Sequence, residues 1–250
     1  MKSVPKRKTV CRIIIAAAAA VVIVGGFHLG NIYFAHSETG LPKDAKKYKP
    51  LVTEFLGARH SFNGISELQE VNPDACAWIT LDKTNIDFPV MYYDNRKYID
   101  KDLYGNYYAG GSIFMDEGNS RHFDDFYSVI YGHYMSGDNP LTDNSGMFCD
   151  VMKFENKQYF EKHTTGSIVT EKGAASLEIM AFLKCSAYDP YIFESIYTED
   201  FAKSELVEYI KTNSINYTER EIGENDKLIA LSTCDPKSEN SRGVVIAVVK

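Results

Sequence analysis

The stretch LIALSTC, residues 228–234, is an apolar run that ends in two hydroxyl residues and a cysteine. A polar, turn-rich segment, DPKSENS, follows it, and Arg242 then opens a second apolar run that ends at Val249. Apolar runs of this length that are rich in β-branched residues and bounded by turn residues are typical of strands. We therefore expect two neighbouring strands joined by a short loop, with Cys234 and Arg242 near one another.

Six more runs of similar composition lie upstream of this pair. Gly, Asn, Asp and Pro bound them, and no strand–helix alternation runs through this part of the chain. About eight short strands with long connections favour a closed or nearly closed β-barrel over a parallel α/β sheet. The predicted fold class is mostly β with helices. The six upstream strands are predicted at residues 76–81, 86–92, 112–115, 127–133, 167–170 and 177–188.

Helices are predicted at three places around these strands. Apolar residues at helical spacing predict one over residues 46–57, which Gly57 would end, and a second over residues 65–71. The long insertion before the last strand pair is expected to hold a third helix at 198–213, with Thr198 as its cap. The side chains expected to face the core from this third helix are Phe201, Leu206, Tyr209 and Ile210.

The N-terminus carries five basic side chains in its first twelve residues and no acidic one. Residues 13–27 are apolar without a break, and the weakly polar extension to Phe34 reaches the length of about 20 residues that a bilayer needs. A cleaved signal peptide and an uncleaved anchor both fit such a run. The lack of an A-x-A-like site and the aromatic Tyr33 and Phe34 favour the anchor.

The positive-inside rule then keeps the N-terminus in the cytoplasm and the part of the chain after the anchor outside the cell. This divides the chain into a cytoplasmic basic tail (1–12), a transmembrane anchor (13–34), a linker with N-terminal helices (35–74) and a β-barrel (75–250). The net charge of −7 argues against nucleic acid as a partner. The five cysteines are odd in number and show no CxxC spacing, which argues against a zinc site or a disulfide framework.

The end of the cysteine strand carries a set of side chains suited to nucleophilic chemistry. Cysteine attacks as the thiolate, which a neighbouring cation such as Arg242 stabilises. Arginine also donates fixed hydrogen bonds to a developing oxyanion. His133 follows an apolar strand and Gly132, a position suited to general acid or base work near neutral pH. On these residues alone, the alternative that Cys234 is an ordinary half-buried cysteine and Arg242 an ordinary strand-edge arginine stays open.

Four segments in order along the chain resemble the class B sortases. They are GSIFMD (111–116), IYGHYM (130–135), KCSAY (184–188) and LSTC (231–234), and the resemblance runs from about residue 65 to residue 249. It implies an eight-stranded sortase-like barrel with N-terminal helices and a long helix-containing loop before the nucleophile strand. It also implies that Cys234 is the nucleophile, His133 the catalytic histidine and Arg242 the catalytic arginine.

The resemblance further suggests residues that bind substrate. Ser232 could bind the substrate threonine or the oxyanion, and Asp235 could orient Arg242 or simply cap the turn. The connection from Cys234 to Arg242 is short for this family, so contacts in that loop could differ. The substrate-binding candidates are Ser232, Thr233, Asp235, Tyr188, Tyr191 and Ile192.

The implied activity is that of a membrane-anchored cysteine transpeptidase of Gram-positive cell surfaces. Such an enzyme cleaves a C-terminal sorting motif after threonine through a thioester and transfers the protein to a cell-wall amine. The partners are then secreted proteins with a sorting motif, the peptidoglycan peptide amine and the lipid bilayer, and no metal or organic cofactor is needed. The alternatives are a cell-wall cysteine hydrolase and a non-catalytic, anchored β-barrel binding module.

Overall fold

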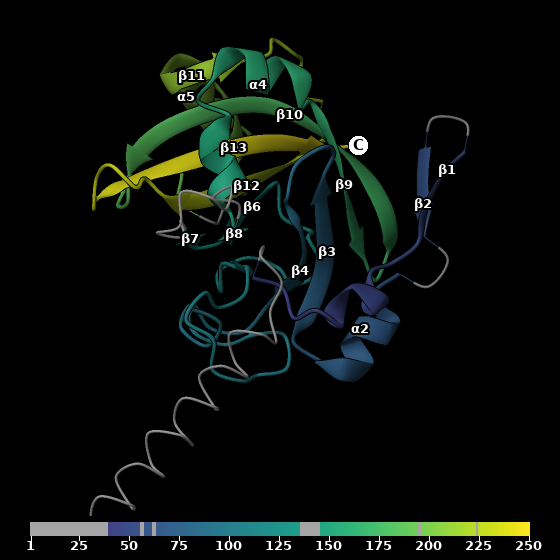
Figure 1. Ribbon diagram of the computed structural model, residues 1–250. Coiled ribbons are helices and arrows are strands. Elements are labelled where there is room, and N and C mark those ends of the chain that lie inside the picture. The colour runs from purple at the N-terminus through teal and green to yellow at the C-terminus, as the bar shows by residue number, and fades with distance from the viewer. Residues whose placement is uncertain (1–39, 56–57, 62–63, 136–145, 195–196, 224) are drawn as a thin grey trace, which may run out of the picture. The chain divides into compact units, whose positions relative to one another are not determined.

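Eight strands form a closed ring in the computed structural model (Figure 1). They are β3 (Ala75–Leu81), β4 (Asp87–Met91), β5 (Phe114–Met115), β6 (Tyr127–Tyr131), β9 (Thr165–Thr170), β10 (Gly173–Ser186), β12 (Lys227–Cys234) and β13 (Ser241–Val249). Their order around the ring is β10, β13, β12, β6, β5, β4, β3 and β9, and pairing of β9 with β10 closes it. Neighbours are antiparallel except for β12 with β6 and β4 with β5. The predicted eight-stranded barrel is confirmed.

The structure describes residues 40–55, 58–61, 64–135, 146–194, 197–223 and 225–250. They fall within one compact unit, Glu38–Lys250. The predicted basic tail (1–12) and membrane anchor (13–34) lie outside the described residues. Within the described ranges, no helix combines the length and the apolar character that crossing a bilayer requires.

The strand that carries Cys234 is buried on both faces. Ile229 and Leu231 belong to the larger apolar core, to which all eight strands contribute and which therefore fills the barrel. Leu228 and Ala230 alternate with them and join a second apolar cluster on the outside of the barrel. A strand with two buried faces has a continuous apolar sequence, which explains the run LIAL.

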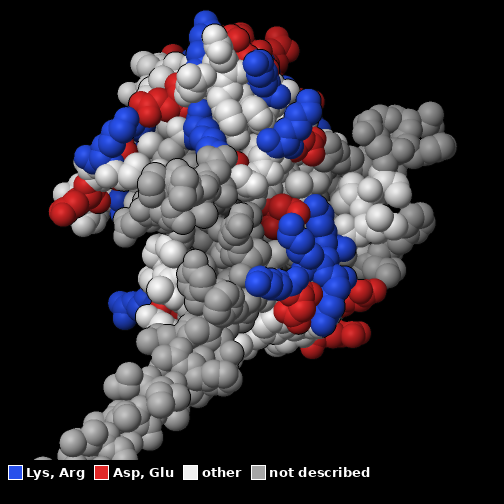
Figure 2. All heavy atoms as spheres, in the orientation of Figure 1, with Lys and Arg blue, Asp and Glu red and all other residues white. Residues whose placement is uncertain are grey.

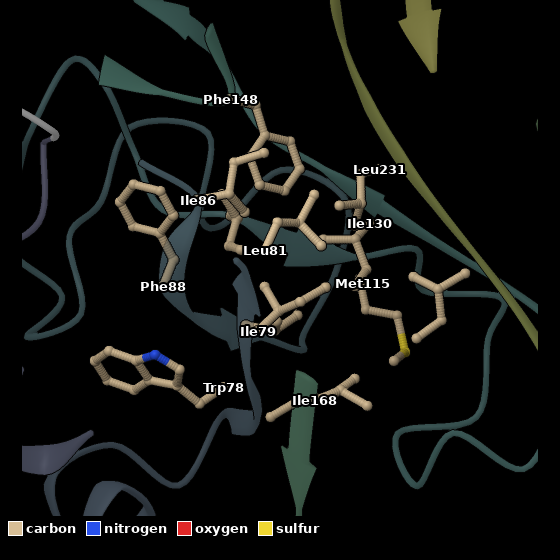
Figure 3. Close-up of a cluster of buried hydrophobic side chains, with 14 of the residues drawn as sticks. Trp78, Ile79, Leu81, Ile86, Phe88, Met115, Ile130, Phe148, Ile168 and Leu231 are labelled. Atoms are coloured by element: carbon tan, nitrogen blue, oxygen red, sulfur yellow. The ribbon is translucent and has the colours of Figure 1, made fainter. Parts of the chain in front are cut away.

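Leu231 and Ile130 are neighbours across the parallel pair of β12 and β6. Figure 3 shows the two side chains close together in the interior core, with Met115 beside Ile130. Both are fully buried, so the strand that ends in Cys234 is held in place by packing on rigid neighbours.

Replacing Leu231 with alanine is expected to lower the free energy of unfolding by about 2–5 kcal/mol, because the substitution leaves a cavity in the interior core. Leu51→Ala is the matched control, since Leu51 is 71% exposed, and should change stability by less than about 0.5 kcal/mol. Urea denaturation of both variants measures the difference. Equal losses in the two variants would contradict the placement of Leu231.

A helix covers the outer cluster. This helix, α5 (Asp200–Asn213), buries Leu206 and Ile210 against the barrel, as expected. Two details of the prediction were wrong. The N-cap is Glu199 rather than Thr198, and no side chain caps the helix. Phe201 is 74% exposed, because it lies five positions before Leu206 and this spacing turns it away from the buried face of the helix.

The N-terminal part differs most from its prediction. A short 3-10 helix, η1 (Ala45–Tyr48), is followed by the hairpin of β1 (Val52–Phe55) and β2 (Ala58–Ser61), so the single helix predicted over 46–57 is wrong. Pro50 explains the break, because the residue before a proline avoids the helical region and Lys49 has ψ 123°. The second predicted helix is confirmed as α2 (Ser66–Val71).

The segment expected to be a linker contributes to the core. Leu41 and Ala45 are buried and belong to the interior core cluster. The remaining elements are α3 (Cys149–Lys153), α4 (Lys157–Lys162), β7 (Tyr134–Met135), β8 (Gly146–Met147) and β11 (Ser214–Tyr217), which pairs with β10. On the face drawn in Figure 2, the described residues carry charges of both signs.

Candidate active site

Cys234 is the last residue of β12, and its side chain is exposed. Its partner across the antiparallel pair is Arg242 on β13. Directly opposed residues in an antiparallel pair share a face of the sheet, with Cβ atoms about 4.5–5.5 Å apart. The short loop after Cys234 therefore returns the chain so that Cys234 and Arg242 oppose one another on one face of the sheet.

The parallel neighbour of β12 brings His133 to the other side of Cys234. Ser232 pairs with Tyr131, and the pairing continues because the amide of Gly132 donates to the Ser232 carbonyl at 3.1 Å. The Thr233 hydroxyl adds a bond to the Gly132 carbonyl at 2.8 Å. In a parallel pair the two chains advance together, so the next step of this register places His133 beside Cys234.

Gly132 is required where the chain passes the core. A Cβ atom at this position would lie 2.6 Å from the ring of Phe148 and 2.9 Å from Cγ2 of Ile113. Any side chain would therefore push the backbone out of the pairing that sets the position of His133. This close approach gives a physical reason for the glycine in the YGH segment.

The site lies on the outer surface of the barrel. Leu228 and Ala230, which share their face with Cys234, belong to the outer cluster. That cluster ends near the tip of β12, where burial gives way to the exposed Cys234. The nucleophile candidate is thus held on a buried strand while its sulfur can meet a polymer substrate.

The other described cysteines are poor nucleophiles. Burial raises the pKa of Cys76 to about 12, of Cys149 to about 11 and of Cys185 to about 12. Only the thiolate attacks, so these thiols stay inactive near neutral pH. Among the cysteines that the structure describes, Cys234 is the one with an exposed side chain.

Arg242 holds part of its guanidinium on the loop that precedes it. Nη1 donates to the carbonyl oxygens of Ser241 at 3.0 Å and Glu239 at 3.3 Å. Among the described residues, Nη2 and Nε have no hydrogen-bond partner. The group is thus anchored at one nitrogen and retains donors that can meet an oxygen developing negative charge near Cys234.

Ser232 and Thr233 face opposite sides of β12. Both are buried, and the hydroxyl of Thr233 is used by Gly132. The hydroxyl of Ser232 lies on the Cys234 face and has no hydrogen-bond partner among the described residues. An unsatisfied buried hydroxyl costs about 1–3 kcal/mol, so a hydrogen bond from a substrate to the Ser232 hydroxyl would be favourable. The Thr233 hydroxyl instead supports the backbone of the neighbouring strand.

Asp235 has contacts that match a turn cap rather than a partner of Arg242. Its Oδ1 accepts from the Lys237 amide at 3.0 Å, and its Oδ2 pairs with Lys184 at 3.2 Å. Burial alone would raise the pKa of the Asp235 carboxyl, but these two groups outweigh it and the pKa is lowered. The resulting stabilisation is present above the ordinary aspartate range and is lost as the pH falls through the lowered pKa.

Asp235→Asn is expected to retain turnover of the same order as the parent chain, because the amide oxygen can still accept from Lys237. The loss of the ion pair with Lys184 should lower the free energy of unfolding by about 1 kcal/mol above pH 5, and the difference should shrink toward pH 3. Peptide turnover and urea denaturation at both pH values check this. A large loss of turnover with unchanged stability would instead support a catalytic role.

The loop between β10 and α5 is pinned by one buried carboxylate. Asp189 accepts from the amides of Tyr191 and Ile192, both at 3.0 Å, and from the hydroxyl of Tyr209 on α5. Tyr191 stacks on Tyr209 with ring centroids 4.4 Å apart. Tyr188 is 83% exposed. The two tyrosines that were candidates for substrate contact are therefore presented on a braced loop.

Ile192 does not face the surface, so its prediction as a substrate-binding residue needs correction. The residue is fully buried in the outer cluster together with Leu206 and Ile210. Its carbonyl accepts from the buried hydroxyl of Tyr127 at 2.9 Å. Ile192 thus supports the loop from beneath.

Two residues near His133 were missed by the sequence analysis. Tyr131 lies two positions before His133 and donates to Asp116 at 2.9 Å. Burial and the Asp116 charge raise the pKa of Tyr131 well above its ordinary value, so the phenol acts as a neutral donor. The carbonyl of Ile99 contacts the His133 ring itself. Among the described residues, no group of three or more His, Cys, Asp and Glu side chains is arranged to hold a metal ion.

An exposed cysteine at a strand end, with an arginine opposite it on one neighbouring strand and a histidine just beyond the end of the other, is the set of residues that a cysteine acyl-transfer enzyme uses. No family model matches the chain. A class B sortase from Streptococcus pyogenes involved in pilus biogenesis is 33% identical, with a TM-score of 0.64, over 74% of this chain and 97% of that structure.

This chain is also similar to two other sortases of class B. A sortase B of Listeria monocytogenes is 28% identical over 183 residues, which are 73% of this chain and 71% of that protein. The sortase B–substrate complex of Staphylococcus aureus is 26% identical, with a TM-score of 0.66, over 74% of this chain and 83% of that structure. The chain belongs to the class B sortases, and it is a cysteine transpeptidase of the sortase B type.

Proposed function

We propose that this sortase cleaves a short sorting motif near the C-terminus of a secreted protein and transfers the new carboxyl end to an amine of the cell wall. Cys234, His133 and Arg242 are the catalytic residues in this proposal. The observation that carries it is the register that sets Cys234 between Arg242 on β13 and the chain leading to His133. The structure of the S. aureus relative is a complex with a substrate, which fits a peptide as the donor.

The first half of the reaction forms a thioester. The sulfur of Cys234 attacks the carbonyl carbon of a threonine in the motif, and the carbonyl oxygen takes up negative charge. Arg242 stabilises this oxyanion through the donors that its loop contacts leave available. His133 protonates the leaving amine as the carbon–nitrogen bond breaks, so that amine departs neutral and the acyl group stays on sulfur.

The second half consumes the thioester. The nitrogen of a cell-wall peptide amine attacks the same carbon, and His133 takes the proton that this amine loses. The carbon–sulfur bond then breaks and Cys234 is regenerated. A thioester keeps the acyl group activated, which lets an amine compete with water for the same carbon.

The predicted N-terminal anchor fits this role. The proposal keeps residues 13–34 as a single membrane span with a cytoplasmic tail at 1–12 and the catalytic barrel outside the cell. An enzyme fixed in this way would meet both secreted proteins that are leaving the cell and the growing wall. Protease treatment of intact cells that express the full chain tests this orientation, because the barrel should be digested while the tail stays protected.

The reaction is tested with the full chain and a library of threonine-containing peptides, with and without an added primary amine. A transpeptidase gives a new amide product whose yield rises with amine concentration. A hydrolase gives only the free acid at every amine concentration. A binding module gives neither product, and a thiol-reactive probe would then label Cys234 equally well in the parent chain and in His133→Ala.

A further inference from the structure

The His133 ring contacts the backbone of a loop far from it in sequence. Its Nε2 lies 2.8 Å from the carbonyl oxygen of Ile99. A carbonyl oxygen can only accept a hydrogen bond, so Nε2 must carry a proton. The neutral ring then has its lone pair on Nδ1, and that nitrogen is the one available to exchange protons with Cys234 and with the substrate amine.

We infer that the Ile99 carbonyl sets the tautomer and the orientation of His133, and that Gly111 is the positioning residue that lets this carbonyl reach the ring. The inference rests on the proposed role of His133 as proton donor and acceptor. A base that is itself oriented by a third group is the arrangement that nucleophilic catalysis requires. Here a neutral backbone oxygen supplies the orientation without adding a charge to the site.

The loop that carries Ile99 is firmly attached to the barrel. Tyr98 is buried, and its hydroxyl donates to Asp74 at 2.8 Å and accepts from Asn72 at 2.9 Å. The carbonyl of Tyr98 accepts from the Ser112 amide at 3.0 Å. The residue that precedes Ile99 is therefore fixed at both its side chain and its backbone, so the Ile99 carbonyl has a defined direction.

Gly111 sits against this carbonyl. Its φ angle is +59°, and a Cβ atom there would lie 2.4 Å from the carbonyl oxygens of both Ile99 and Tyr98. No real Cβ approaches backbone oxygens so closely, so any side chain at position 111 would force this part of the loop away from residues 98 and 99. The Ile99 carbonyl is the group that would move, and the His133 ring would lose its acceptor.

The same loop provides a matched control. Gly105 also has a positive φ angle, +78°, but a Cβ atom there would meet nothing within 4 Å. Alanine at either position bears the strain of the left-handed conformation. Only alanine at position 111 adds the collision with the Ile99 carbonyl, so the difference between the two variants isolates the effect of that contact.

We expect Gly111→Ala in the full chain to lower kcat for a cleaved peptide by at least about tenfold, because a misplacement of about 1 Å can cost about 10² in rate. KM should stay within about threefold, since the peptide-binding surface is not altered. Gly105→Ala should leave both constants within about threefold of the parent. Equal losses in the two variants, or an unchanged kcat in Gly111→Ala, would overturn the inference.

The tautomer is read directly in the parent chain, so the test does not depend on whether a variant folds. Nitrogen-15 NMR of the full chain with labelled histidine should show the neutral His133 ring protonated at Nε2, with His133→Gln used to assign its signals. A neutral ring protonated at Nδ1 would overturn the inference even if Gly111→Ala is inactive. A parent chain that cleaves no peptide would contradict the proposed function while leaving this reading of the tautomer intact.

Discussion

Cys234→Ala is expected to abolish peptide cleavage by the full chain, since no other described cysteine is exposed. Both halves of the proposed reaction pass through the acyl group held on the sulfur of this residue. Removing a covalent nucleophile removes the thioester route itself, so the residual rate should fall by at least about 10⁴ toward the uncatalysed level. Peptide cleavage followed by chromatography measures the loss, and circular dichroism confirms that the variant remains folded.

Cys185→Ala is the matched control for this loss. Cys185 pairs with Arg242 on the side away from Cys234, so it is the nearest comparable thiol in the sheet. Burial and the Asp189 charge raise the pKa of Cys185 to about 12, so its thiolate is scarce near neutral pH. This variant should retain turnover of the same order as the parent. If Cys234→Ala still cleaved peptide while Cys185→Ala did not, the proposal that Cys234 is the nucleophile would be wrong.

Arg242→Lys is expected to lower kcat by at least about 10², the loss that follows removal of one oxyanion-hole donor. Lysine keeps the positive charge but lacks the planar set of donors, so the loss would reflect hydrogen-bond geometry more than charge. KM should change less than kcat, because the oxyanion forms only in the transition state. Steady-state kinetics with one cleaved peptide separates the two constants.

Arg220→Lys serves as the control for Arg242→Lys. Arg220 forms an ion pair with Glu178 on β10, and lysine can retain that pairing. Turnover of this variant should match that of the parent. A rise in KM without a fall in kcat for Arg242→Lys would instead indicate that Arg242 binds the substrate in its ground state.

The barrel was predictable because its strands have strong local signals. The run LIAL (228–231) is apolar at every position since both faces of β12 are buried. The N-terminal helix prediction failed for a local reason as well, because Pro50 interrupts an otherwise helical spacing. The prediction that Phe201 faces the core failed for a different reason. Its apolar character suggested burial, but helix geometry turns it away from the face of Leu206.

The site was only partly predictable. A loop of a few residues forces Cys234 and Arg242 together, so the sequence alone brought these two side chains close. The strand-end position of His133 marked it as a candidate acid or base, but its place beside Cys234 depends on a parallel pairing between strands about a hundred residues apart, which has no local signal. The Ile99 contact had no signal in the sequence, since a backbone carbonyl can belong to any residue. The sequence feature related to this contact is Gly111 within GSIFMD, because two segments of the chain approach too closely there for a side chain.

The thioester on Cys234 can be observed by mass spectrometry of the full chain after incubation with a cleaved peptide and no amine. We expect an acyl adduct on the tryptic or chymotryptic fragment that contains Cys234, with the mass of the peptide's N-terminal part. Added amine should discharge this adduct and release the new amide product. Cleavage of the peptide with no adduct on Cys234, or with an adduct on another residue, would contradict the proposed reaction.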